Sequence, residues 1–251
     1  MPTIQDVIQH LERIAPPIYQ ESYDNAGLIC GNAQAEVTGV LTCLDSTEAV
    51  IEEAIAKSCN LVVAHHPIVF RGLKQLTGRN YVERTLLRAI KNDVAIYAIH
   101  TNLDNMYVQG VNARFAERLG LENTRILAPK ATFQELRFQV AATDLEEIYA
   151  LDRTFTGPAT VVVPAARPDR YEARATIAAG DLPAFCRAIG TFVKSTINTQ
   201  PLQEVNPQVG SGMLGQLPEP MEELEFLHFL KRQMQTACVK HTALRGKPVQ
   251  R

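Results

Sequence analysis

The first half of the chain alternates between helical and extended hydrophobic patterns. Apolar residues recur at helical spacing in four segments, 3–14, 47–57, 81–91 and 111–119. Three short runs between them are apolar without alternation and are expected to be strands, 37–44, 61–64 and 94–99. Strands that lack a polar face and are separated by helices indicate a mainly parallel sheet covered on both faces. The predicted fold class is α/β.

The pattern changes after about residue 130. Four further strands are expected at 136–142, 159–163, 171–178 and 197–205, with helices at 144–151 and 181–189. The resulting order, β-α-β-β-α-β, is typical of a ferredoxin-like unit that closes its own small antiparallel sheet. We therefore predict a separate α+β module at 132–217.

The last part of the chain predicts one amphipathic helix and little else. Apolar residues line one face after Pro220: Met221, Leu224, Leu227, Leu230 and Met234. Pro220 fits the first position of this helix. In the first half of the chain, Ser46 is the expected N-cap of the helix at 47–57. A short strand is expected at 237–242, and 244–251 is expected to turn into another strand. A chain that ends where a strand begins predicts an incomplete domain.

Composition excludes several classes of protein. The 251 residues are 46% hydrophobic and 21% charged with a formal charge of −2, which is ordinary for a globular protein. No apolar run approaches the length of a membrane span, and the near-neutral charge gives no support for nucleic-acid binding. The five cysteines form no C-x-x-C pair, which together with the lack of a signal sequence predicts reduced thiols in a cytoplasmic protein.

Histidines follow two neighbouring strands of the predicted sheet. His65 and His66 come directly after the run 61–64, and His100 follows 94–99, with Asp104 four residues later. Because the carboxyl ends of parallel strands meet at the same edge of a sheet, these side chains are expected to converge.

Such a set favours a metal site. Imidazoles with one carboxylate suit Zn, Fe, Mn, Co or Ni better than Ca or Mg. Adjacent strand residues point to opposite sides, so His65 and His66 are expected to serve two nearby ions, or one ion and an outer hydrogen bond. The alternative is that these residues only cap strand ends. The other histidines are assigned to the surface or to packing: His10, His228 and His241.

Gly210–Gly215 matches G-x-G-x-x-G literally, but its context does not support dinucleotide binding. That fingerprint needs a buried strand before it and a helix beginning at its last glycine. Pro207, Pro218 and Pro220 surround the segment, so we interpret it as a turn and expect no nucleotide cofactor.

Three segments in series resemble signatures of one family. They are Tyr23-Asp24-Asn25-Ala26-Gly27-Leu28, Ala64-His65-His66-Pro67-Ile68-Val69-Phe70 and Ala98-Ile99-His100-Thr101-Asn102-Leu103-Asp104. The chain resembles the dinuclear-metal GTP cyclohydrolase I type 2 homologues, also called NGG-one-interacting factor three-like proteins. In addition, 210–226 is similar to the segment by which long members leave an inserted domain.

The resemblance implies a metal-binding N-terminal half at 1–131, an inserted ferredoxin-like domain at 132–217, and the truncated start of a C-terminal half at 218–251. It implies two divalent ions held by His65, His66, His100 and Asp104, with the remaining histidine and glutamate ligands lying beyond this sequence. It also implies a ring-shaped homohexamer in the bacterial cytoplasm, with its metal sites facing an internal cavity.

Two classes of function remain open. The leading hypothesis is a metal-dependent hydrolase that acts on a nucleotide or a phosphoester small molecule. Asp24, Asn25 and Lys74 are candidates for orienting substrate, although turn formation and surface charge are the favoured interpretation of these three. No catalytic acid or base is identified. The alternatives are a metal-binding oligomeric scaffold or regulatory interaction protein without catalysis, and a fragment without function of its own.

Overall fold

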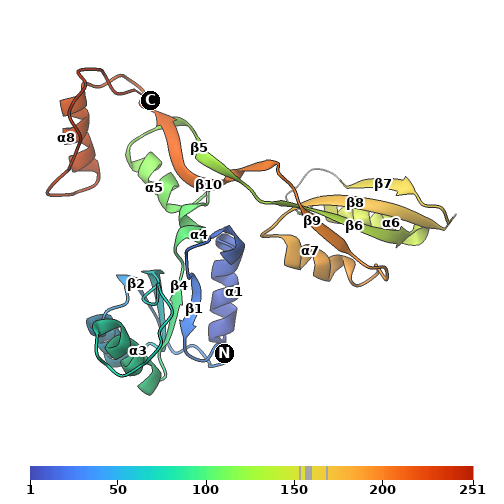
Figure 1. The fold of residues 1–251 in the computed structure, drawn as a ribbon, viewed down its shortest axis with the longest axis horizontal. Helices are drawn as coiled ribbons and strands as arrows, with labels where there is room; N and C mark the ends of the chain where they lie inside the picture. The colour runs from blue at the N-terminus through green and yellow to red at the C-terminus, as the bar shows by residue number, and fades with distance from the viewer. Residues whose placement is uncertain (153, 156–159, 168, 251) are drawn as a thin grey trace. The chain divides into compact units, whose positions relative to one another are not determined.

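The computed structural model describes residues 1–152, 154–155, 160–167 and 169–250 (Figure 1). The chain divides into two compact units, Met1–Asn112 and Ala113–Arg251. Residues 159 and 251, which belong to segments predicted above, lie outside the described residues.

The first unit is built on a four-stranded sheet in the order β1-β4-β3-β2. Its strands are β1 (Gly27–Cys30), β2 (Val40–Asp45), β3 (Leu61–His66) and β4 (Ala95–Ala98). Strands β2, β3 and β4 run parallel, whereas β1 is antiparallel to β4. Strand β1 is only four residues long and was not predicted. The predicted mixed α/β class is confirmed.

Helices cover both faces of this sheet, as the unbroken apolar runs of β3 and β4 require. They are α1 (Ile4–Ile14), α2 (Glu48–Ala56) and α3 (Tyr81–Lys91). Ile4 and Ile8 of α1 pack with Leu61 and Tyr97 on one face. On the other face the buried residues of α2, α3 and the strands include Ile51, Leu86, Val62 and Ile96. Successive strand residues therefore enter different cores, which explains why the run 61–64 is apolar at every position.

The helix starts follow from local capping. Thr3 forms a capping box with Asp6, and the side chain of Asn80 accepts a hydrogen bond from the backbone of Glu83. The N-cap of α2 is Thr47 rather than Ser46, because the Thr47 side chain is the one that accepts from Val50 N. Two short helices, η1 (Pro17–Tyr19) and α4 (Thr101–Asp104), complete the unit, and α5 (Val111–Arg118) follows.

The second unit contains a two-stranded antiparallel sheet and a four-stranded one. Strand β5 (Glu122–Ala131) pairs with β10 (Val205–Gln216). The chain between them contains β6 (Phe133–Ala141), η2 (Ala142–Asp144), α6 (Leu145–Asp152), β7 (Val161–Pro164), β8 (Arg170–Ala178), α7 (Leu182–Ile189) and β9 (Asn198–Pro201). Their sheet has the order β7-β8-β6-β9 with antiparallel neighbours throughout. Helix α8 (Glu223–Gln233) follows β10.

Two sequence expectations for this unit were wrong. Gly210–Gly215 is not a turn but part of β10, with Ser211 paired to Ala128. Its glycines allow close strand approach, since a Cβ on Gly210 would lie 2.7 Å from Ile126 Cγ2. The strands expected at 237–242 and within 244–251 are not formed by the described residues of these segments. Instead, Met221 and Val249 form a single antiparallel bridge. No helix among the described residues is long and apolar enough to cross a membrane.

Candidate metal centre

The structure brings three histidines together at the carboxyl edge of the sheet. His65 and His66 are the last two residues of β3, and His100 lies between β4 and α4. The imidazole centroids are 4.9 Å apart for His65–His66, 5.2 Å for His65–His100 and 5.5 Å for His66–His100. One ligand nitrogen from each ring lies within 4.8 Å of the others. We call these three residues the histidine cluster.

The expected divergence of His65 and His66 is not observed. Their rings are tilted by 51° and both contribute to the same cluster. Side chains alternate strictly only while the strand pleat continues. His65 and His66 are the last two residues of β3, and each ring is held by its own contact, His65 Nδ1 with Ile99 O and His66 Nδ1 with Asp45 Oδ1. The three rings therefore form one group of candidate metal ligands.

Asp104 lies beside the cluster rather than within it. Its Oδ1 is 3.7 Å from His65 Nε2, at the carboxyl end of the short helix α4. Burial raises the pKa of the Asp104 carboxyl, against the opposing effect of the nearby imidazoles. The proximity that the sequence predicted for Asp104 is present, at a distance longer than a hydrogen bond.

Each ring of the cluster has its Nδ1 held by an oxygen. His65 Nδ1 lies 3.0 Å from Ile99 O, and His66 Nδ1 lies 2.8 Å from Asp45 Oδ1. His100 Nδ1 lies 2.8 Å from Asp24 Oδ1. A carbonyl or carboxylate oxygen accepts, so these contacts favour the tautomer with its proton on Nδ1. That tautomer leaves the Nε2 lone pair available to a metal, which is the usual arrangement around ligating histidines.

Asp24 contacts the histidine cluster, although the sequence suggested it only as a residue that orients substrate or forms a turn. Its side chain is 0% exposed, and besides His100 it accepts hydrogen bonds from Asn25 N, at 2.7 Å, and from Thr101 N, at 3.1 Å. The Thr101 hydroxyl donates to the same carboxylate. Burial by itself raises the pKa of Asp24, but the hydrogen bonds from His100, Thr101 and Asn25 outweigh it and lower the pKa. Asp24 is therefore a buried carboxylate that orients His100.

Asp45 orients His66 in the same way but from a more exposed position. It is the last residue of β2 and stands opposite His66 in the parallel register. Asp45 was not among the site residues predicted from the sequence. The sequence did contain a signal for it. Asp45 directly follows the predicted strand at 37–44, whose carboxyl end was expected at the same edge as those of the two strands that carry the histidines.

Among the described contacts, the other two candidates for orienting substrate make no hydrogen bond to the histidine cluster. Asn25 Nδ2 donates to Val69 O at 2.7 Å and so ties its own turn to the segment after β3. This contact supports the structural interpretation of Asn25. Lys74 is exposed in that same segment.

A hollow of about 410 Å³ adjoins His66. Its lining combines the outer carboxylate, the start of α2 and residues after β3: Asp45, Ser46, Thr47, His66, Pro67, Ile68 and Tyr81. The amino end of α2 carries the positive end of the helix dipole and faces this space through its cap, Thr47. The hollow is large enough for a small molecule to approach the histidine cluster from this side.

Comparison with known proteins places these features in a family. The sequence profile of the family described as Duf34/NIF3 (NGG1p interacting factor 3) matches residues 2–251. The chain is similar to proteins named "GTP cyclohydrolase 1 type 2 homolog". It is 36% identical to that of Clostridium acetobutylicum over 125 residues, covering 50% of this chain and 46% of the relative. It is 41% identical to that of Bacillus subtilis over 128 residues, covering 51% and 34%. The matched segments thus span less than half of these relatives.

Solved structures give the same result over the whole chain. A Bacillus cereus protein related to NIF3 is 29% identical with a TM-score of 0.78, covering 100% of this chain and 75% of the other. Staphylococcus aureus protein SA1388 is 23% identical with a TM-score of 0.73, covering 99% and 73%, a likeness of fold alone.

Proposed function

Since this chain belongs to the Duf34/NIF3 family, we propose that it binds divalent transition-metal ions and takes part in hydrolysis of a nucleotide or phosphoester. The ligands in this proposal are the Nε2 atoms of the histidine cluster together with Asp104. Two features of the same cluster carry it: each ring has its Nδ1 held by an oxygen, which leaves its Nε2 available to a metal, and one ligand nitrogen from each ring lies within 4.8 Å of the others.

The donor set suits the proposed metals. Neutral imidazoles with a carboxylate are ligands of Zn, Fe, Mn, Co and Ni. When bound, such ions lower the pKa of water and polarise phosphoryl or ring-carbon centres. Asp24 would hold the ring of His100 in position and Asp45 that of His66. Each carboxylate would also raise the basicity of its imidazole, because it accepts a hydrogen bond from the Nδ1–H group. The hollow beside His66 would admit the substrate.

Several parts of the proposal concern the complete protein. We propose two ions, of which this chain supplies part of the ligand set, and a cytoplasmic homohexamer with the sites facing its cavity. We also propose that 132–217 is a ferredoxin-like insertion in a core with a mainly parallel sheet. The strand order β7-β8-β6-β9 and the parallel pairings of β2, β3 and β4 support this description.

Metal binding is tested first, without reference to activity. The purified chain is incubated with Zn²⁺, Mn²⁺ or Ni²⁺, dialysed, and analysed for bound metal. We expect about one equivalent or more for the wild type and a large loss for His65→Ala and His100→Ala. His228→Ala, an exposed histidine on α8, is the matched control. Equal metal content in all four proteins would refute the site.

Hydrolysis is tested separately. The metal-loaded full-length protein is assayed with a phosphodiester and with GTP, with and without His66→Ala. A rate that falls in the variant supports the hydrolase. Equal residual rates in both proteins, with metal bound to the wild type, would refute catalysis and leave a metal-binding scaffold.

A further inference from the structure

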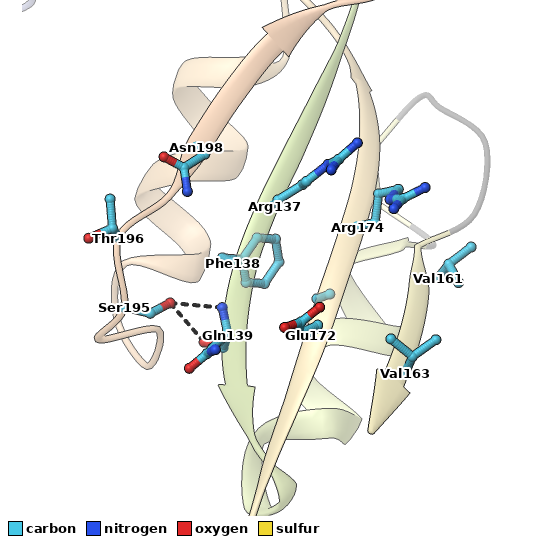
Figure 2. A pocket seen from close by; sticks show the side chains of 11 residues that line it. Arg137, Phe138, Gln139, Val161, Val163, Glu172, Arg174, Ser195, Thr196 and Asn198 are labelled. Carbon is cyan, nitrogen blue, oxygen red and sulfur yellow. Dashed lines mark hydrogen bonds between the residues drawn. The ribbon is translucent and has the colours of Figure 1, made fainter. Parts of the chain in front are cut away.

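One face of the sheet β7-β8-β6-β9 has no helix over it in the described part of the unit. Helices α6 and α7 pack on the other face, where Ile148, Phe185 and Ile189 join Leu136 and Phe138 in a buried core. The open face contains a hollow of about 600 Å³, a volume typical of small-molecule sites. Figure 2 shows the side chains that line it.

Two arginines stand directly opposite each other on this face. Arg137 of β6 and Arg174 of β8 are register partners, and their side chains are 54% and 57% exposed. Like charges at opposed positions destabilise a sheet unless something balances them. Here Glu135, only 10% exposed, lies 2.6 Å from Arg137 Nε and 3.5 Å from Arg174 Nε.

Glu135 satisfies only part of the hydrogen-bonding capacity of the two arginines. Each guanidinium has five N–H donors, more than the oxygens of one shared carboxylate can accept. Glu172, the second carboxylate that lines the hollow, balances the charge of the pair without a hydrogen bond or ion pair to either arginine among the described contacts. Gln200 Nε2 donates to the same Glu135 oxygen that Arg137 contacts, at 2.8 Å, which fixes the carboxylate in place. Both arginine side chains are more than half exposed and line the hollow. Together the two guanidinium groups can donate hydrogen bonds to the oxygens of a planar carboxylate or a tetrahedral phosphate.

The sides of the hollow differ in chemistry. Val161 and Val163 of the edge strand β7 are 58% and 47% exposed and offer an apolar surface. On the opposite side, Ser195 is fixed by hydrogen bonds with the backbone N and O of Gln139, at 2.8 and 3.0 Å. Asn198 adds a polar group beside it. A bound molecule would therefore contact the two arginines at the base of the hollow, the valines of β7 on one side and the polar residues near Ser195 on the other.

Two features argue against single-stranded nucleic acid or another polyanion as the occupant. Single-stranded nucleic acid is bound through exposed aromatic platforms. The one aromatic among the described lining residues, Phe138, is buried with its ring centroid 6.5 Å from that of Phe185 in the core. A polyanion lying along the floor would meet Glu172, which is exposed two residues from Arg174.

We propose that this hollow binds a small organic anion, with one phosphate or carboxylate between Arg137 and Arg174 and an apolar group against Val161 and Val163. None of these residues belongs to the histidine cluster, so the proposal is independent of metal binding and hydrolysis.

Calorimetric titration of the chain tests this site with simple probes. Phenyl phosphate and benzoate carry the two head groups, inorganic phosphate lacks the apolar part, and phenol lacks the charge. We expect saturable binding of at least one of the first two, weaker binding of phosphate and none of phenol. Saturation by neither aromatic anion, or equal binding of phenol, would overturn the proposal.

Variants locate the binding. Arg174→Gln is expected to weaken the aromatic anion about tenfold or more, and Arg137→Gln similarly, because each removes charged hydrogen bonds. Arg187→Gln, which replaces an exposed arginine on α7, makes the same charge change on the other face and is expected to alter binding less than twofold.

Val163→Thr is expected to weaken the binding of phenyl phosphate but not that of inorganic phosphate, which tests the apolar side without changing the arginines. Circular dichroism confirms folding of each variant, and equal losses in Arg174→Gln and Arg187→Gln would refute the site.

Discussion

Replacing Asp24 by asparagine tests whether the histidine cluster depends on its buried outer carboxylate. In the wild type, Oδ1 of Asp24 accepts from His100 Nδ1 and Asn25 N, and Oδ2 accepts from the backbone and hydroxyl of Thr101. An amide has only one accepting oxygen, so Asp24→Asn must turn its NH₂ toward one of these pairs of donors. The variant therefore loses either the orientation of His100 or the bonds to Thr101.

The size of the effect follows from burial. Loss of an outer partner of a ligating histidine commonly lowers metal affinity about 10- to 100-fold, or about 1.4–2.7 kcal/mol. Because the Asp24 side chain is 0% exposed, water cannot replace the missing acceptor, and we expect about 1.5–3 kcal/mol of lost stability as well. The two effects are separable, since stability is measured without metal.

Zinc affinity is measured by competition with a chromogenic chelator, and stability by urea unfolding. Asp169→Asn, an exposed aspartate that makes the same charge change, is the control. A double-mutant cycle with Thr101→Val then isolates the Asp24–Thr101 coupling. Zinc affinity within twofold of the wild type in a folded Asp24→Asn protein would refute the inference that this carboxylate orients His100.

Three further predictions concern the surroundings of the site and the second core. Asp45→Asn is expected to lower zinc affinity less than Asp24→Asn, because Asp45 is 59% exposed and water can substitute for it; an equal or larger loss by chelator competition would contradict this. Hydrogen bonds from the backbones of Thr77 and Arg79 lower the pKa of Glu83 from 4.5 to about 2. Its stabilising contribution is thus complete above about pH 4.5 and lost as the pH falls toward 2, so melting curves of the wild type and Glu83→Gln should differ at pH 6 and converge near pH 2. Phe185→Ala empties a fully buried position between α7 and β6 and should cost about 3–5 kcal/mol in urea unfolding, whereas a loss below about 1 kcal/mol would show that the core closes the cavity.

Local patterns in the sequence were enough to predict most elements of the first unit. The helix expected at 81–91 is α3 with the same bounds, and the runs 61–64 and 94–99 contain most of β3 and β4. Helical and strand periodicity are properties of a few consecutive residues, so they can be read without knowing the fold. The placement of His65 and His100 at one edge needed only one further rule, that parallel neighbouring strands end together.

Elements whose form depends on a distant partner were not predicted. Gly210–Gly215 has the composition of a turn, and only its pairing with β5 makes it a strand. The outer carboxylates are a second example: Asp24 lies 76 residues from His100, and Asp45 lies 21 residues from His66. The opposition of Arg137 and Arg174 is a third, because it depends on the register of β6 against β8. Periodicity identifies which face a residue occupies, whereas strand order and register decide which residue it meets there, and both depend on contacts between segments far apart in the chain.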